Sequence, residues 1–231
     1  MFSKEFLNTL QKVNTYSDKV VLKYPITVLN SDSNDVIITI NAQNLGCSEF
    51  ENTGIYELSK FISMLGIFTE ADVKREDKLL KIHSVTETAA FTLCDLDLLK
   101  AHDLQAELIT NLDKYPSVSE FEFSANDLAV FKKASNVLNE LNALKIEGSG
   151  GNTEVSLALH NRFNASSNEY NKVYLGTSQK DFVVKLGIEN VQKLPGVDYT
   201  VKVKYNEEKD AYRVIFVNAN FTILISKLAD Q

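Results

Sequence analysis

The sequence is short of the residues that mark several protein classes. It has three prolines and no tryptophan in 231 residues, which argues against a linker-rich or mucin-like chain. Its two cysteines, Cys47 and Cys94, are too few for a disulfide framework and lack metal-ligand spacing, as is typical of a reducing interior. No apolar run reaches the ~18–20 residues that cross a bilayer, and Met1 begins no signal peptide. We therefore expect a cytoplasmic protein with no membrane partner.

Charge and reactive side chains exclude further classes. The formal net charge is −7, so any contact with nucleic acid has to come from basic residues gathered on one surface. His83, His102 and His160 are far apart and have no second ligand at metal spacing. The glycine-rich run 148–151 lacks the Gly-Lys-Ser/Thr of a phosphate-binding loop and is typical of a hairpin turn. We therefore predict no enzyme activity, no catalytic residue, no metal and no cofactor.

The first half of the chain predicts two helices among short strands. Residues 3–14 have helical periodicity, with Ser3 as the N-cap and Glu5 in the first turn. A second amphipathic helix lies within residues 52–68. The two apolar stripes consist of Phe6, Leu7, Leu10 and Val13, and of Leu58, Phe61, Ile62 and Leu65. Strand-like runs cover 20–24, 26–30, 36–41, 48–53, 71–75, 79–84 and 89–94.

The second half repeats this succession after a polar stretch that we interpret as a connector. A helix begins after Ser124, with Asp127 at the capping-box position, and a short helix covers 188–194. Strand-like runs cover 121–123, 143–147, 155–160, 172–176, 182–186, 199–205, 212–217 and 221–225. The predicted organisation is an N-terminal domain at 1–95, a connector at 96–117 and a C-terminal domain at 118–231.

Matching residues support a duplication. Phe2-Ser3, Leu7, Leu10 and Lys12 match Phe123-Ser124, Leu128, Phe131 and Lys133 at a constant offset of 121 residues (124 − 3). Near the end of each half, Ala90-Phe91-Thr92-Leu93 matches Asn220-Phe221-Thr222-Ile223. The simplest explanation is a repeated unit of two helices packed on antiparallel strands. The fold class that we predict is therefore α+β with two similar domains.

The segments with the most distinctive pattern resemble a known family. Ile55–Ile67, Phe121–Leu128, Pro195-Gly196 with Tyr199, and Asn220–Ile225 are similar in order and placement to the DNA polymerase sliding clamp of the T-even-type bacteriophages. The resemblance implies two processivity-clamp domains and a ring of three chains joined head to tail, with the helices around duplex DNA. It also implies an ATP-driven clamp loader and a replicative DNA polymerase as partners. The protein would then be viral and would work in the host cytoplasm.

Lysines on the polar faces of all four helices are the candidate DNA-facing residues. A lysine on such a face is ordinarily just solvated, and that reading stays open for each of them. Their presence on every helix of an acidic chain favours loose contact with phosphates, without sequence preference. The candidates are Lys4, Lys12, Lys60, Lys132, Lys133 and Lys193.

Two further sites follow from the resemblance. Two strand edges would meet between subunits, although both strands could also be ordinary internal strands. The interface candidates are Ala90, Phe91, Leu93, Val173, Tyr174 and Leu175. A hydrophobic pocket beside the connector would bind peptides of the polymerase and loader, although its residues could simply fix the connector to the sheets. The pocket candidates are Leu96, Leu98, Leu99, Tyr115, Pro116, Ile223, Ile225 and Leu228.

Three other functions remain open. A non-ring processivity subunit of the same fold would need a strongly basic face, which this acidic chain lacks. A virion-type structural oligomer without DNA binding would give no reason for lysine on every helix. A hydrolase of unknown type is the alternative with the least support.

Overall fold

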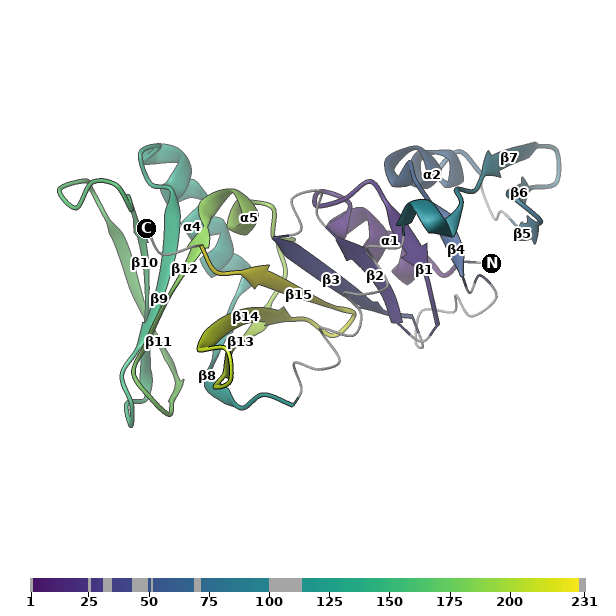
Figure 1. The fold of residues 1–231 in the computed structure, drawn as a ribbon. Helices are drawn as coiled ribbons and strands as arrows, with labels where there is room; N and C mark the ends of the chain where they lie inside the picture. Colours follow the sequence, from purple (N-terminus) through teal and green to yellow (C-terminus); the bar gives the residue numbers. More distant parts are fainter. Residues whose placement is uncertain are drawn as a thin grey trace. The chain divides into compact units, whose positions relative to one another are not determined.

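The computed structural model describes residues 2–24, 26–30, 35–42, 50, 52–68, 72–99 and 114–228, without the side chains of 26 and 28–30. It forms two compact units, Met1–Thr110 and Asn111–Gln231, and each is described by itself (Figure 1). The division falls within the predicted connector. Cys47, His102 and residues 48, 49 and 51 of the predicted strand at 48–53 lie outside the described residues.

Among its described residues, unit 1 has two α-helices and two antiparallel sheets. Helices α1 and α2 lie side by side (Figure 1). The strands pair in the orders β4-β1-β2-β3 and β5-β6-β7. The elements are α1 Lys4–Val13, β1 Val20–Leu22, β2 Ile26–Asn30, β3 Val36–Asn41, β4 Thr53–Ile55, α2 Leu58–Leu65, β5 Asp72–Glu76, β6 Leu79–His83, β7 Thr88–Thr92 and the short 3-10 helix η2 Leu96–Leu99.

The first helix shows how local sequence and packing agree in unit 1. The Ser3 hydroxyl accepts a hydrogen bond from the Phe6 amide at 3.0 Å, so the expected N-cap is confirmed. A cap of this kind stabilises a helix by about 1 kcal/mol. Phe6, Leu10 and Val13 are fully buried. The apolar stripe therefore forms part of the core, and the opposite face of the helix is left to the solvent.

The described residues of unit 2 form two α-helices and eight antiparallel strands. The strands pair in the order β12-β9-β10-β11-β8-β13-β14-β15. The elements are β8 Ser117–Phe123, α4 Ala125–Val137, β9 Ala143–Gly148, β10 Glu154–His160, β11 Tyr170–Ser178, β12 Phe182–Gly187, α5 Ile188–Gln192, β13 Tyr199–Asn206, β14 Ala211–Val217 and β15 Phe221–Ser226.

The same motif occurs twice within unit 2. Each copy runs strand, helix and three strands, first from β8 to β11 and then from β12 to β15. The first strand of each copy pairs with the second strand of the other, as β8 with β13 and β12 with β9. In unit 1, β4 pairs with β1 in the corresponding way. The two helices named by the sequence echo, α1 and α4, also begin 121 residues apart (125 − 4), each after a capping serine.

The succession of helices and strands predicted from the sequence is confirmed, with shifts at the ends of elements. One shift is in β4, which spans Thr53–Ile55 and not 48–53, and another is in β8, which begins at Ser117 and not at Phe121. This strand pairs with β11 on one side and β13 on the other. Its apolar residues Val118, Phe121 and Phe123 are buried. Pairing extends the strand back to Ser117, the last residue of the predicted connector.

Candidate functional site

The structure places the lysines of unit 1 on the solvent side of α1 and α2. Lys4 and Lys12 are exposed at the two ends of α1. Lys60 is exposed on α2, and its ammonium forms an ion pair with Glu57. The hydrogen bond and the negative charge of Glu57 raise the pKa of Lys60. The ion pair offsets the positive charge of α2, so α1 carries the stronger basic character in this unit.

In unit 2 the candidate lysines fall into two groups. Lys133 and Lys193 are exposed on α4 and at the end of α5. Lys132 is half-buried, and its ammonium donates a hydrogen bond to the carbonyl oxygen of Leu194 at 2.6 Å. Burial lowers the pKa of Lys132. Lys132 therefore links α4 to the segment that follows α5. Its position opposite the apolar stripe did not predict this role.

Side-chain hydrogen bonds also connect α4 directly to α5. The Gln192 side-chain amide donates to the Ser135 hydroxyl at 3.0 Å and to the Asn136 side-chain oxygen at 3.3 Å. In unit 1, the Asn14 side-chain amide donates to the Ser59 hydroxyl at 3.1 Å between α1 and α2. Each unit thus holds its two helices at a fixed spacing and presents their outer faces together.

Strand β7 has one unpaired edge among the described residues. It pairs with β6, and the Leu93 amide donates to the Lys78 carbonyl at 2.8 Å. In an antiparallel ladder alternate amides face the partner strand, so the amide of Phe91 also faces β6 and those of Ala90 and Thr92 face away. Ala90 is exposed, whereas Leu93 is buried within unit 1. The Phe91 ring packs on Phe61 of α2, with ring centroids 5.2 Å apart.

Strand β11 has an unpaired edge along its first half, within the part of unit 2 that the structure describes. Residues 170–175 pair with β10, and only 176–178 also pair with β8. The side chains of Val173 and Leu175 are 57% and 82% exposed. Tyr174, between them, is buried. Of the three interface candidates here, two therefore point to solvent and the third points into unit 2.

The pocket candidates do not share one environment. In unit 1, Leu98 is exposed, Leu99 is buried, and Leu96 borders a cavity of ≈ 400 Å³ together with Leu93 and Cys94. Burial raises the pKa of the Cys94 thiol.

The pocket candidates of unit 2 divide into buried and accessible residues. Ile223 and Ile225 are fully buried on β15 and belong to the core, so their side chains do not reach a surface that a partner could touch. Pro116 is exposed, and Tyr115 and Leu228 are partly exposed. Lys204 donates to the Tyr115 carbonyl oxygen at 3.1 Å, which fixes the chain as it enters β8.

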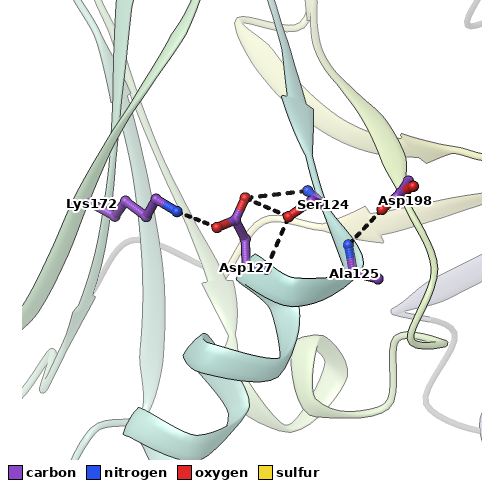
Figure 2. Close-up of polar contacts among 5 residues, drawn as sticks. All are labelled: Ser124, Ala125, Asp127, Lys172 and Asp198. Carbon is purple, nitrogen blue, oxygen red and sulfur yellow. Dashed lines mark hydrogen bonds and ion pairs between the residues drawn. The ribbon is translucent and has the colours of Figure 1, made fainter.

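One ion pair was not predicted from the sequence. Lys172 on β11 forms an ion pair with Asp127 at the start of α4 (Figure 2). The capping-box pattern predicted the place of Asp127 but not this partner, which lies 45 residues away. Alternation along β11 is the one sequence signal available, since it puts Lys172 on the inner face with Tyr170 and Tyr174.

Nothing in the described residues suggests metal chemistry or a membrane span. No group of three or more histidine, cysteine, aspartate or glutamate residues could hold a metal ion within that part of the chain. No described helix is long and apolar enough to cross a membrane.

Comparison with known proteins finds similarity in structure and not in sequence. No protein-family model matches the chain, and no curated protein matches it. The Proliferating Cellular Nuclear Antigen (PCNA) of Entamoeba histolytica has a TM-score of 0.65 at 11% identity, over 97% of this chain and 95% of that one. The PCNA2-PCNA3 complex of Sulfolobus tokodaii gives 0.61 at 11%, over 97% and 96%.

A bacterial clamp is also similar. The Helicobacter pylori beta clamp bound to a DNA ligase peptide has a TM-score of 0.61 at 13% identity, over 98% of this chain and 65% of that one. The chain thus spans slightly less than two thirds of the beta clamp, but nearly all of the PCNA chains. These likenesses show that the chain has the sliding-clamp fold, and the predicted fold class is confirmed.

Proposed function

We propose that this protein is a DNA sliding clamp, in which three chains close head to tail around duplex DNA and tether the replicative polymerase. The clamp would do no chemistry itself and would be opened by an ATP-driven loader. The observation that carries the proposal is a sliding-clamp fold over nearly the whole chain, with an exposed lysine on or at the end of each of the four described α-helices. The T-even-type bacteriophage class is part of the same proposal and is supported by the order of the sequence segments.

The proposed ring joins β7 of one copy to the first half of β11 of the next. Outward amides at Ala90 and Thr92 can donate to a neighbouring strand, and unpaired edges of this kind invite such pairing. Head-to-tail contacts of a single kind produce a closed ring when the rotation between copies closes. The similar Sulfolobus tokodaii structure is a PCNA2-PCNA3 complex, which supports association of chains with this fold.

Sedimentation equilibrium tests the assembly. We expect a species of about three times the 25.9 kDa chain, in exchange with monomer as concentration falls, because a loader has to be able to open the ring. A strict monomer at high micromolar concentration would contradict the proposed ring. A dimer would contradict it equally, since two chains joined head to tail would leave one β7 edge and one β11 edge without a partner.

The partner pocket is proposed at the start of the connector, where Leu96 and Leu98 are accessible. The Helicobacter pylori beta clamp was solved with a DNA ligase peptide bound, which supports peptide binding by clamps in general. We expect Leu96→Ala with Leu98→Ala to reduce stimulation of the cognate polymerase at least about tenfold, since buried anchors dominate such interfaces. Polymerase assays on primed circles measure the effect.

Two variants control that experiment. Ile67→Ala removes an apolar side chain of the same unit that is 70% exposed and does not line the cavity beside Leu96, and it should leave stimulation unchanged. The double variant should keep its sedimentation behaviour. Equal loss of stimulation in the Ile67 variant, or full stimulation by the double variant, would contradict a partner pocket at Leu96 and Leu98.

A further inference from the structure

The first half of β11 is attached to α4 by one polar contact (Figure 2). The Lys172 ammonium reaches the Asp127 carboxylate, and the two side chains are 41% and 13% exposed. The Lys172 ammonium also lies 5.1 Å from the centre of the Tyr174 ring. The contact joins an edge strand, with a backbone partner on one side, to the first turn of a 13-residue helix.

Hydrogen bonds with Ser124 fix the side chain of Asp127 independently of Lys172. Its carboxylate accepts from the Ser124 hydroxyl at 2.8 Å and from the Ser124 amide at 3.4 Å. The Asp127 amide in turn donates to the Ser124 hydroxyl at 3.1 Å. Burial alone would raise the pKa of Asp127, but hydrogen bonds from Lys172 and Ser124 outweigh it and hold the pKa below its usual value. The helix start is fixed further by Asp198, which accepts from the Ala125 amide at 2.8 Å (Figure 2).

The neighbours of Lys172 on the same face of β11 pack by their rings. Tyr170 meets Phe131 of α4 with ring centroids 5.1 Å apart, and Tyr174 meets Phe121 of β8 at 5.6 Å. The buried Tyr174 hydroxyl has no hydrogen-bond partner in the described part of the chain. Ring packing lacks the fixed donor and acceptor of a charge-assisted hydrogen bond. Pairing with β10 fixes the register of this half-strand, and Lys172 adds the polar contact that holds it to α4.

We propose that Lys172 is a positioning residue for assembly, which locks the free edge of β11 to α4 so that a second copy of this chain can dock on it. The inference rests on the proposed ring. A strand that is already ordered loses less conformational freedom when it pairs, so a locked edge binds its partner more tightly. The same pair connects the helix that carries Lys133 to the interface between copies.

The test compares assembly of the full-length chain with Lys172→Met and Lys172→Arg, by sedimentation equilibrium at low and high salt. Methionine keeps the apolar stem and removes the charge. For a partly buried ion pair we expect a loss of about fivefold per interface. A closed trimer contains three identical interfaces, so the concentration of half-assembly should rise about 11-fold (5 to the power 1.5). Arginine should restore assembly to within about twofold of the natural chain.

A matched variant separates position from charge. Lys202→Met removes a lysine of the same unit that pairs with Glu120 at 3.3 Å between β13 and β8, away from the free edge of β11. It should leave assembly unchanged at both salt concentrations. High salt should weaken the natural chain toward the Lys172→Met variant, because it screens the pair. Thermal unfolding midpoints of all the variants should agree within a few degrees.

Each other outcome overturns the inference. Equal weakening by Lys202→Met would mean that net charge controls assembly. Unchanged assembly of Lys172→Met, or a fall of its unfolding midpoint in step with its assembly, would mean that the pair has no positioning role. If the natural chain itself stays monomeric, the proposed ring fails, and that result is seen before any variant is compared.

Discussion

Protein loaded on a nicked circular duplex is expected to stay bound through a high-salt wash and to leave once the circle is cut. Besides Lys60, which pairs with Glu57, four candidate lysines per chain are exposed: Lys4, Lys12, Lys133 and Lys193. If about four phosphates are contacted at a time, a fourfold rise in salt lowers a purely electrostatic affinity about 100-fold. Retention at high salt must then come from the closed ring.

The comparison between circular and linear DNA distinguishes the remaining functions. A non-ring processivity subunit held by charge would wash from both forms alike. A virion-type structural oligomer would bind neither form. Equal rates of loss from circles and from linear DNA would therefore contradict the clamp proposal, whatever the affinity at low salt.

Charge reversal on the helices separates loading from retention. Replacing Lys4, Lys12, Lys133 and Lys193 by glutamate should impair loading, because the DNA backbone then meets repulsion as it enters the ring. A control variant reverses four lysines of strands and turns, with the same change in net charge: Lys78, Lys145, Lys185 and Lys209. It should load normally. Lys132 is left unchanged in both, because its bond to Leu194 belongs to the fold.

Features set by neighbouring residues were predictable from the sequence. The start of α1 after Ser3 follows from a hydroxyl that caps the helix, and the box at Ser124 and Asp127 marks α4 in the same way. Apolar spacing predicted which faces of these helices are buried, as Phe6 and Phe131 show. The resemblance to clamps then gave the fold class, because order and spacing persist where identity does not.

Features set by distant residues were not predictable. Ile225 is apolar and near the C-terminus, which fits a partner pocket as well as a core. The structure pairs β15 with β14 and buries the Ile225 side chain in the core. Lys132 and Lys133 have the same chemistry in sequence, and only the place of Leu194 distinguishes them. The pair of Lys172 with Asp127 depends on the position of β11 beside α4. Each case depends on which segments pack together, and local pattern does not contain that information.

Ala90→Pro is expected to abolish ring assembly at concentrations where the natural chain is trimeric. The Ala90 amide faces away from β6, so proline removes a donor that the fold of unit 1 does not use. Its ring also occupies the space that a neighbouring strand would enter. A loss of at least about tenfold per interface raises the concentration of half-assembly about 30-fold in a ring with three interfaces (10 to the power 1.5).

The choice of Ala90 follows from the side chains around it. Phe91→Asp would place a charge against Phe61 and damage the core of unit 1, so loss of assembly in that variant would not test the edge. Ala90→Val is the matched control, because it enlarges the side chain and keeps the amide. Sedimentation equilibrium should find the valine variant trimeric and the proline variant monomeric, with similar unfolding midpoints. A trimeric proline variant would show that β7 is not the edge that joins the copies.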